Sequence, residues 1–430
     1  MLERILAVTL CVAGLGLAAP ARGAPGDLDP SFGVDAVNGP GPFGPGMVVT
    51  DDHQLADYAR GLVLESDGKI VYALGGPFGI RRRLPDGSFD GTFGDRGQYG
   101  ITGIADLAIA ADGNVIMTGY GVDAQEDYRY RGFVGRVNPD GLPTPSGRAP
   151  DRRSTLDRQF NRIAVADDGR LIAAGAYIRV VQPHRFAANR SLADLSADDG
   201  FGRGGRGSTT RPTLSTLYGA TAVLPLTGGR VMLVGSAFPP GAPDFDIVLV
   251  RYAADGHLDR AFGTRGVVTS NLGDHEQAFD AALDGSGRIV VAGSTGLYPA
   301  HPRFLVVRYL PDGTLDPGFN GSGAAIPDFG DEDAEAYAVA IQADGKIVVA
   351  GEAHDTLALV RYLPDGTLDS TFGTAGLVVT PLPAGNTAES RALVIQLDGK
   401  LVVGGLACRQ PPPASQPSCF YPVLARYLAD

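Results

Sequence analysis

Arginine and aspartate recur at fixed positions of a repeated sequence, and they are the most regularly spaced ionisable residues in the chain. Set around a ring, such pairs could form a series of ligand sites. The arginines are Arg251, Arg308, Arg361 and Arg426, and the aspartates are Asp259, Asp316, Asp369 and Asp29. We favour a structural role, in which each arginine ties a strand to the Leu-Asp turn that follows it. The phenylalanines that come next at a constant spacing would pack beneath that turn: Phe262, Phe319, Phe372 and Phe32.

A dense group of carboxylates precedes the sixth copy of the repeat, within the stretch Asp328–Glu335. Calcium takes several oxygen ligands in flexible geometry, so calcium is the candidate cofactor here. The candidate ligands are Asp328, Asp331 and Asp333. Their order does not match an EF-hand loop, and a solvated acidic turn is the interpretation that we favour.

The residues that usually perform catalysis form no recognisable motif. None of the six histidines has the spacing of a metal-binding pair, although a zinc or histidine-dependent site assembled across repeats stays open. No serine lies in a G-x-S-x-G nucleophile elbow. The glycine-rich stretch Gly200–Gly207 lacks the lysine and the following helix of a phosphate loop. Tryptophan is absent, which argues against a sugar-binding platform of indole rings, although the 15 tyrosines could substitute.

The repeat itself is clearest at Ala336–Thr380. Its four short apolar runs are Ala338–Gln342, Ile347–Gly351, Leu357–Tyr362 and Leu377–Thr380, and three of them are rich in β-branched residues. Asp344-Gly345 between the first two runs is a strong signal for a tight hairpin. Pro364-Asp365-Gly366 after the third run is another turn. Each copy therefore predicts four antiparallel strands.

The glycine of the first hairpin turn marks seven copies of this repeat. It occurs at Gly68, Gly113, Gly169, Gly229, Gly287, Gly345 and Gly399. Each is followed by an apolar run of the kind found in strands that are covered on both faces.

A second signature, Arg-Tyr-x-x-Asp-Gly-x-Leu-Asp-x-x-Phe-Gly, closes each copy. It is complete at Arg251–Gly263 and Arg361–Gly373, and slightly altered at Arg82–Gly94 and Arg308–Asn320. Repeat two keeps only its front half, at Arg136–Gly141, and repeat three keeps little of Arg185–Gly202 beyond Phe201-Gly202. We interpret Leu142–Asn161 and Gln182–Arg211 as irregular segments, either insertions or decayed outer strands.

The two ends of the chain each carry part of one repeat. Arg426–Asp430 stops within the second signature, Gly26–Gly33 supplies its remainder, and Met47–Thr50 matches a fourth strand. A repeat divided in this way is explained if the array closes on itself, because the N-terminal strand then covers the edge of the last sheet. The sequence therefore predicts an all-β fold, a seven-bladed β-propeller whose last blade is completed by residues 26–50.

The pattern DGKIVVAG…LVRYLPDGTLDSTFG within residues 344–373 resembles the bacterial delta-60 repeat. The resemblance covers Gly26–Asp430 and is strongest in repeats four to seven. It implies a β-propeller-type unit that is found in exported proteins. No common activity comes with the family, so the resemblance does not imply a ligand.

The first residues have the pattern of an export signal. Met1–Arg4 carries a basic residue, Ile5–Ala18 is largely apolar, and Ala19-Pro20-Ala21 offers a cleavage site, although cleavage after Gly23 fits nearly as well. We predict a signal peptide at residues 1–21, one propeller domain at residues 22–430, and a periplasmic or extracellular location. The apolar run is too short to span a bilayer.

Two cysteines, Cys408 and Cys419, flank a proline-rich segment in the last repeat. In an oxidising compartment this arrangement predicts a disulfide that closes a small loop.

Two classes of function remain. The net charge of -12 argues against non-specific binding to nucleic acid or to anionic membranes. We expect a monomeric, non-catalytic exported scaffold that binds a protein or a glycan through loops on one face, with a role in adhesion or envelope assembly as a variant. The alternative is a propeller enzyme, lactonase- or lyase-like, with a metal in the central channel. Convergent carboxylates in the channel would favour the enzyme, and small apolar residues would favour the scaffold.

Overall fold

The computed structural model is built almost entirely of β-strands. It describes residues 23–33, 45–49, 59–74, 79–100, 103–123, 129–144, 149–150, 157–179, 182–206, 219–239, 241, 244–296, 301–330, 333–408 and 420–429. Within these ranges the regular elements are the strands β1 to β27 and one 3-10 helix, η1 (Thr227–Gly229).

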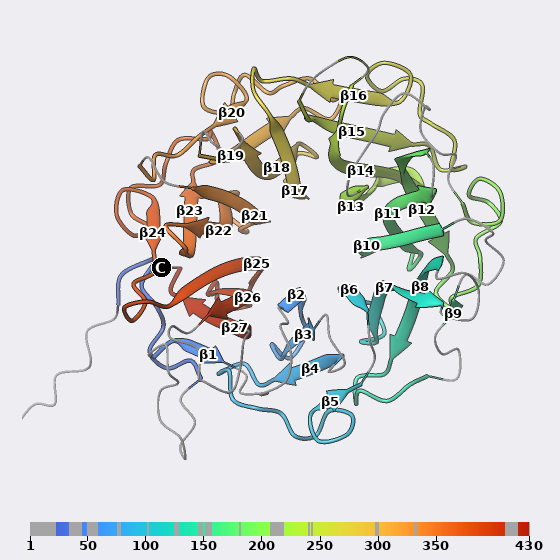
Figure 1. Ribbon diagram of the computed structural model, residues 1–430. Helices are drawn as coiled ribbons and strands as arrows, with labels where there is room; N and C mark the ends of the chain where they lie inside the picture. Colours follow the sequence, from blue (N-terminus) through green and yellow to red (C-terminus); the bar gives the residue numbers. More distant parts are fainter. Residues whose placement is uncertain are drawn as a thin grey trace, which may run out of the picture.

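Seven antiparallel sheets surround a central axis (Figure 1), which confirms the predicted seven-bladed β-propeller. Blades 1 and 2 contain β2 (Ala59–Leu64), β3 (Ile70–Leu74), β4 (Ile80–Arg83) and β5 (Gln98–Tyr99), then β6 (Ile104–Ile109), β7 (Val115–Asp123), β8 (Arg129–Val137) and β9 (Ala149–Pro150). Blades 3 and 4 contain β10 (Asp157–Val165), β11 (Leu171–Arg179) and β12 (Gln182–Ser191), then β13 (Ala220–Leu226), β14 (Arg230–Ala237), β15 (Asp246–Tyr252) and β16 (Val267–Ser270).

The remaining three blades follow the same outward order of strands. Blades 5 and 6 contain β17 (Glu276–Leu283), β18 (Ile289–Thr295), β19 (Arg303–Tyr309) and β20 (Ala324–Ala325), then β21 (Ala334–Ile341), β22 (Ile347–Ala353), β23 (Thr356–Tyr362) and β24 (Leu377–Val379). Blade 7 contains β25 (Thr387–Ile395), β26 (Leu401–Cys408), β27 (Phe420–Tyr427) and β1 (Met47–Val49). In every blade the first of these strands lies nearest the axis.

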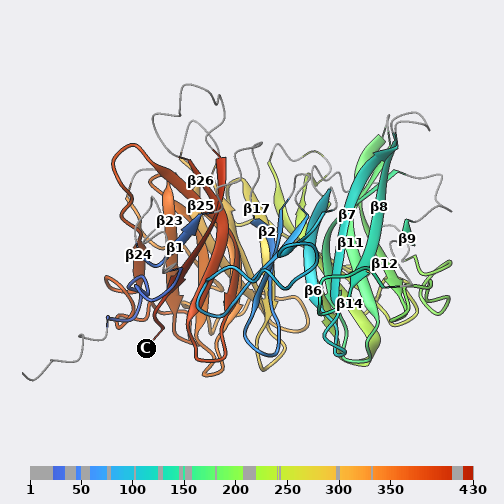
Figure 2. The same ribbon diagram turned by 90° about the horizontal axis from the view of Figure 1, so that it is seen from below.

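The antiparallel order gives the ring two different ends. The turns between first and second strands and between third and fourth strands lie at one end, which we call the clamp end. The turns between second and third strands and the connections to the next blade lie at the other end, the connection end. In the side view of Figure 2 the C-terminus marks the clamp end, at the bottom.

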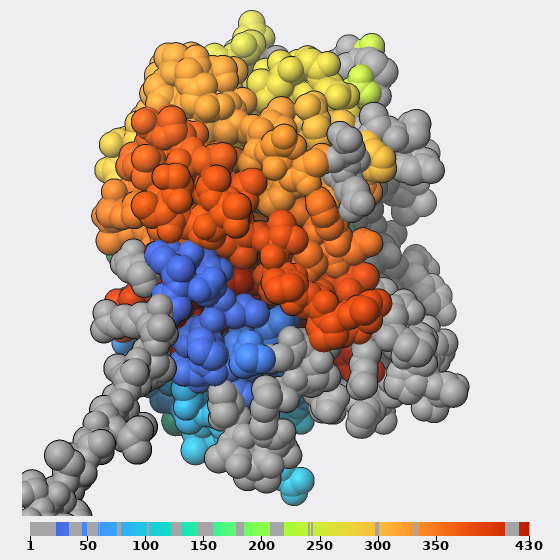
Figure 3. Space-filling model, turned by 90° about the vertical axis from the view of Figure 1, so that its left-hand side faces the viewer, coloured from blue at the N-terminus to red at the C-terminus, as the bar shows by residue number. Residues whose placement is uncertain are grey.

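The N-terminal segment closes the ring by joining the last blade. Strand β1 pairs antiparallel with β27, with Met47 opposite Ala425. Before β1, the Gly26 N–H donates to the Leu428 carbonyl and the Asp29 N–H donates to the Arg426 carbonyl, both at 2.8 Å. Figure 3 shows the N-terminal residues, in blue, lying against the orange and red C-terminal blades. The last blade thereby gains the outer strand that its own end of the chain lacks.

The segments predicted to be irregular are more ordered than expected. Residues 182–191 form β12, a regular third strand paired with β11, so the irregular assignment was wrong there. Within Leu142–Asn161, β9 is a two-residue outer strand and the innermost strand β10 already begins at Asp157. Blade 3 has three strands, and in its described residues the outer edge keeps only the bridge between Asn189 and Arg206.

The hydrophobic core lies between neighbouring blades. Second strands are buried on both faces, as in β14, where Val231, Met232, Leu233 and Val234 are all 0% exposed. One buried cluster joins Met232 and Val234 of blade 4 to Val291 and Leu305 of blade 5. Because each sheet is covered by its neighbours, the apolar runs need no polar alternation.

Every innermost strand carries a β-bulge near its start. The pairing register shifts at the equivalent place in β2, β6, β10, β13, β17, β21 and β25. A bulge bends the strand and re-aims the extra residue. In blades 5, 6 and 7 the extra residues are Phe279, Tyr337 and Arg391. These three residues lie on innermost strands and so are close to the axis.

Candidate functional site

The repeated arginines lie against the repeated aspartates at the clamp end. The Nε–Oδ2 distances are 2.9 Å for Arg251–Asp259, 2.7 Å for Arg308–Asp316 and 2.9 Å for Arg361–Asp369. In blade 7 the pair joins the two ends of the chain, with Arg426 2.9 Å from Asp29. Each guanidinium carbon also lies between 4.3 and 4.8 Å from the centroid of a phenylalanine ring: Phe262, Phe319, Phe372 or Phe32.

The same arginines donate to backbone carbonyls of the next blade. The acceptors are Pro311 for Arg251, Pro364 for Arg308, Ala429 for Arg361 and Pro85 for Arg426. The last of these contacts runs from blade 7 to blade 1, so the series continues across the point of closure. These side chains are engaged by protein groups, and we assign them a structural role as clamps between blades.

Blades 1 and 3 carry two further clamps, and the one in blade 3 was not predicted from the sequence. Arg82 pairs with Asp90 in blade 1, within the altered signature already recognised. Arg190 pairs with Asp198 in blade 3, at 2.7 Å, and lies over the Phe201 ring. The signal was present, because these three residues have the same spacing as Arg361, Asp369 and Phe372. The prediction placed the start of this signature at Arg185, so the clamp of Arg190 was not recognised.

The structure does not bring the candidate calcium ligands together. Asp328 Oδ1 accepts from the Gly330 N–H at 2.9 Å, and Asp333 Oδ1 lies 2.6 Å from His301 Nδ1. Asp331 lies outside the described residues. No group of three His, Cys, Asp or Glu side chains within the described ranges could hold a metal ion. The calcium assignment therefore stays a prediction without structural support.

Cys408 is the last residue of β26 and is 7% exposed. Cys419 lies outside the described residues, so the disulfide between them also stays a prediction.

An unpredicted group of ionisable residues gathers at the connection end, between blades 6 and 7. We call it the glutamate cluster: Glu335 and Tyr337 of β21, Glu352 of β22, and Glu389 and Arg391 of β25. The Tyr337 hydroxyl donates to Glu335 and lies 3.3 Å from Glu352 Oε1. Arg391 binds Glu389 with two hydrogen bonds of 2.9 and 2.8 Å. Its guanidinium carbon lies 3.8 Å from the Tyr337 ring centroid.

The bulges explain how neighbouring blades build this cluster. Tyr337 and Arg391 are the extra residues of their strands, so both project out of the regular alternation. Phe279, the extra residue of blade 5, continues the row with its ring centroid 5.0 Å from that of Tyr337. A wall of two aromatic rings and one guanidinium therefore runs along three adjacent innermost strands.

Crowding of carboxylates perturbs the acid–base chemistry of the cluster. Burial and the neighbouring carboxylates of Glu389 and Glu335 raise the pKa of Glu352 to about 7. Burial also raises the pKa of the Tyr337 hydroxyl far above its usual range, which keeps it protonated as a donor. The nearby Glu389, together with Tyr337 and Glu352, raises the pKa of Arg391 despite its burial. Glu352 is thus the member that changes charge near neutral pH.

A cavity of about 160 Å³ opens beside the cluster, and we call it the acidic cavity. It is lined by Glu352, Asp355, Thr387, Ala388, Glu389, Leu406 and Cys408. Asp355 belongs to the two-residue turn between β22 and β23, where His354 and Asp355 both have positive φ angles of 56° and 59°. Histidine and aspartate tolerate this conformation better than most residues, and it matches the tight hairpin.

The signal for this site was weak in the sequence. Glu335 and Glu389 occupy the same place in their repeats, one residue before the paired residue that precedes the bulge. Both lie outside the two repeated signatures, and Glu352 has no counterpart in the clamp pattern. Glu335 and Glu352 lie opposite one another in the β21–β22 hairpin, and the packing of blade 7 against blade 6 adds Glu389.

Charged side chains also occupy the axis. Arg162 of β10 donates to the Phe279 carbonyl of blade 5 at 3.2 Å, and so reaches past blade 4. Asp106 accepts from the Ile163 N–H and Asp280 from the Val339 N–H, each linking two neighbouring blades. Burial, partly offset by Arg162, raises the pKa of Asp106 to about 6. Because these carboxylates and Arg162 are each bonded to backbone groups, the lining is neither a group of free carboxylates nor a set of small apolar residues, and the channel criterion does not separate the two classes of function.

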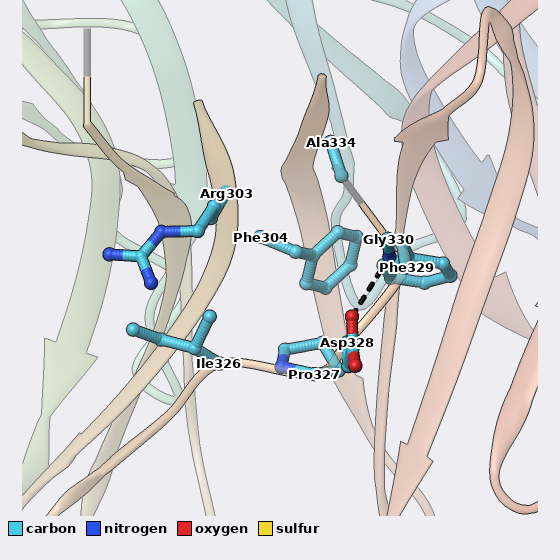
Figure 4. A pocket seen from close by; sticks show the side chains of 8 residues that line it. All are labelled: Arg303, Phe304, Ile326, Pro327, Asp328, Phe329, Gly330 and Ala334. Atoms are coloured by element: carbon cyan, nitrogen blue, oxygen red, sulfur yellow. Dashed lines mark hydrogen bonds between the residues drawn. The ribbon is translucent and has the colours of Figure 1, made fainter. Parts of the chain in front are cut away.

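A second cavity, of about 180 Å³, lies between blades 5 and 6, and we call it the rim cavity (Figure 4). Its lining residues are Arg303, Phe304, Ile326, Pro327, Asp328, Phe329, Gly330 and Ala334.

These features define the class of protein: a closed seven-bladed β-propeller with arginine clamps at one end and an acidic cavity at the other. Residues 285–319 and 342–372 match a family described as a domain of unknown function (DUF5122) beta-propeller. This match supports a propeller-type repeat. A search of curated proteins gave no match.

Solved structures resemble the chain in fold. A streptogramin B lyase has a TM-score of 0.50 and 10% identity over 88% of this chain and 97% of its own. An ulvan lyase, a polysaccharide lyase, has a TM-score of 0.50 and 11% identity over 87% of this chain and 94% of its own. At these identities the likeness shows the propeller fold alone. No helix within the described ranges is long and apolar enough to cross a membrane.

Proposed function

We propose that the protein is an exported, non-catalytic β-propeller that binds a partner at its connection end, through a cationic group that enters the acidic cavity. The observation that carries the proposal is the convergence of Glu335, Glu352 and Glu389 at that end. At the clamp end, by contrast, the repeated arginines and aspartates are engaged with one another and with backbone carbonyls.

The negative charge of the cavity favours a positively charged ligand. Glu352, Asp355 and Glu389 line it, and Arg391 of the cluster is paired with Glu389. An ammonium or guanidinium group would relieve the carboxylate repulsion that, together with burial, raises the pKa of Glu352, whereas an anionic group would add to that repulsion. Lysine or arginine side chains of a protein and amino sugars of a glycan both present such groups.

The test uses ligands that differ only in charge. Binding of a lysine-rich peptide and of a chitosan oligosaccharide would be measured by calorimetry, each beside its fully N-acetylated form. We expect at least one charged form to bind, the acetylated forms to bind at least 10-fold more weakly, and E389Q to weaken binding by a similar factor. The control D398N removes an exposed aspartate from a clamp-end turn and should change nothing. Equal binding by E389Q and the unmodified protein would contradict the proposal.

The titration of Glu352 favours a second candidate function, a propeller enzyme with Glu352 as a general acid–base. A carboxyl with a pKa about 7 suits proton transfer at neutral pH, and Tyr337 is positioned beside it as a second donor. A screen of lactones for hydrolysis and of glycans for elimination would test this reading. Turnover that E352Q abolishes without loss of folding would replace the binding proposal, and stoichiometric bound calcium or zinc in the purified protein would support a metal-dependent form.

We also propose that residues 1–21 direct export and that the mature protein is a monomer with a Cys408–Cys419 disulfide. The pattern of the first residues supports export, and the position of the two cysteines on either side of a proline-rich segment supports the disulfide. Mass spectrometry of the mature protein would measure the cleavage site and the thiols together. A retained N-terminus, or two free thiols, would contradict it.

A further inference from the structure

We propose that the rim cavity binds a small zwitterion with an apolar side chain, of the kind presented by a free apolar α-amino acid. This ligand and this site are separate from the cationic group and the acidic cavity proposed above. The inference rests on an arginine and an aspartate that line one cavity together with apolar side chains, and that form no ion pair with any residue that the structure describes.

The positive side of the cavity is Arg303, at the start of β19. Its side chain is exposed and forms no ion pair or hydrogen bond with any described residue. Arg308 of the same strand is by contrast a clamp, bound to Asp316 and to the Pro364 carbonyl. An unengaged guanidinium is a ready partner for a carboxylate, which it binds with two parallel hydrogen bonds.

The negative side is Asp328, in the connection between blades 5 and 6. Asp328 Oδ1 accepts from the Gly330 N–H at 2.9 Å, which fixes the carboxylate, and no described cation pairs with Asp328. The other oxygen is therefore available for an ammonium group. Figure 4 shows Arg303 and Asp328 on opposite sides of the Phe304 ring, with the guanidinium extending away from Asp328, so the exposed Arg303 side chain would turn inward to meet the carboxylate of a ligand.

The floor between the two charges is apolar. Phe304 and Phe329 lie with ring centroids 5.4 Å apart, and Ile326 is 44% exposed. His354 Nε2 contacts the Phe329 carbonyl and so supports this wall from the neighbouring turn. The Phe304 ring is already fully buried, so an aliphatic or aromatic side chain placed here would cover the exposed surface of Ile326 and of the partly exposed Phe329, at about 25 cal/mol per Å² removed from water.

The size and charge of the rim cavity together limit the class of ligand. A cavity of about 180 Å³ accommodates one small molecule and no folded segment. A purely anionic ligand would meet Asp328, and a purely cationic one would meet Arg303. A zwitterion satisfies both charges and leaves its side chain for the apolar floor.

The experiment measures binding of L-leucine and L-phenylalanine to the full mature chain by calorimetry. N-acetyl-leucine removes the ammonium, leucinamide removes the carboxylate, and glycine removes the side chain. We expect binding of leucine or phenylalanine and at least a 10-fold loss for each of the three analogues. R303Q and D328N should each produce a similar loss, whereas R260Q, which removes another exposed arginine, should leave the affinity unchanged.

Arg303, Asp328 and Arg260 are all exposed, so we expect the three variants to fold normally. Circular dichroism would verify this. Absence of leucine and phenylalanine binding would overturn the inference, as would equal binding of leucinamide and leucine. Retention of binding in both R303Q and D328N would place the ligand elsewhere and would also overturn it. E389Q should not affect leucine binding, so failure of the acidic cavity proposal is distinguishable from failure of this one.

Discussion

At the scale of single residues, each clamp arginine pairs with an aspartate, and either charge would destabilise the fold if it were left buried without its partner. Arg361 is 1% exposed and contacts Asp369 of its own blade and the Ala429 carbonyl of the next. A buried pair contributes less than its contacts suggest, because both charges lose water. Removing one partner, however, leaves the other charge buried and unpaired.

Removal of one clamp partner should therefore cost more than removal of both. We expect R361L to lower the free energy of unfolding by about 3 to 4 kcal/mol, and the double variant R361L/D369L to lower it by less. Urea unfolding of the single and double variants measures this difference. K69A, which breaks an exposed pair with Asp67, should cost under about 1 kcal/mol. A double variant less stable than R361L would show that packing, and not the unpaired charge, dominates.

Acid should weaken the clamps. Burial opposes ionisation of Asp369, but hydrogen bonds from Thr371 and the nearby charges of Arg361 and Lys346 hold its pKa below the usual range. A lowered pKa means stability that is present above the unfolded value of about 3.9 and is lost as the pH falls through the folded value. D369N removes this group, so unfolding free energy measured below pH 4 should fall less steeply with acid in D369N. An unchanged slope would contradict the clamp as a source of acid sensitivity.

Ionisation of Glu352 should change stability with pH in the direction opposite to that of Asp369. Its pKa is raised to about 7 from an ordinary value of 4.5, so ionisation of Glu352 disfavours folding. The resulting loss of stability accumulates between about pH 4.5 and 7 and is constant above that range. We expect E352Q to be more stable than the unmodified protein at pH 8 by on the order of 2 kcal/mol, and nearly equal to it at pH 5. Chemical denaturation at both pH values measures the difference, and equal stability at pH 8 would exclude an ionised, buried Glu352.

At the scale of strands and turns, the fold was largely predictable because repeats impose local signals. The Asp344-Gly345 turn lies between β21 and β22, and the apolar run after it is the buried strand β22. The strand β12 was missed because its sequence is rich in polar residues and carries no β-branched residue, while pairing with β11 overrides that composition.

The glutamate cluster could not be predicted at this scale. Its residues come from three strands, and their convergence depends on the bulges that place Tyr337 and Arg391 near the axis. A bulge is set by the pairing register of two strands and leaves no fixed residue at the extra position. The sequence therefore predicted the clamps, which repeat, and missed the site, whose residues differ from blade to blade.

The N-terminal strand should be needed for solubility. Deletion of Gly26–Thr50 removes β1 and Asp29, which exposes the edge of β27 and leaves Arg426 without its aspartate. We expect the truncated protein to aggregate and to melt at a lower temperature, as measured by light scattering and thermal unfolding. A soluble truncation of equal stability would contradict the role of β1.

At the scale of the whole molecule, the protein is a closed ring with two unlike ends. The clamps and the shared last blade hold the ring closed, and the closed ring brings the innermost strands of blades 5, 6 and 7 together. The acidic cavity is lined in part by blade 7, the blade that the N-terminal strand completes, so this site depends most directly on correct closure.

A cross-link between the paired terminal strands tests this claim most directly. Met47 lies opposite Ala425, so M47C/A425C should form a disulfide within one chain, seen by mass spectrometry as a joined pair of peptides. M47C/T269C, with its second cysteine on the outer strand of blade 4, should not. Free thiols at positions 47 and 425 after oxidation, or links only between separate chains, would contradict the closed ring.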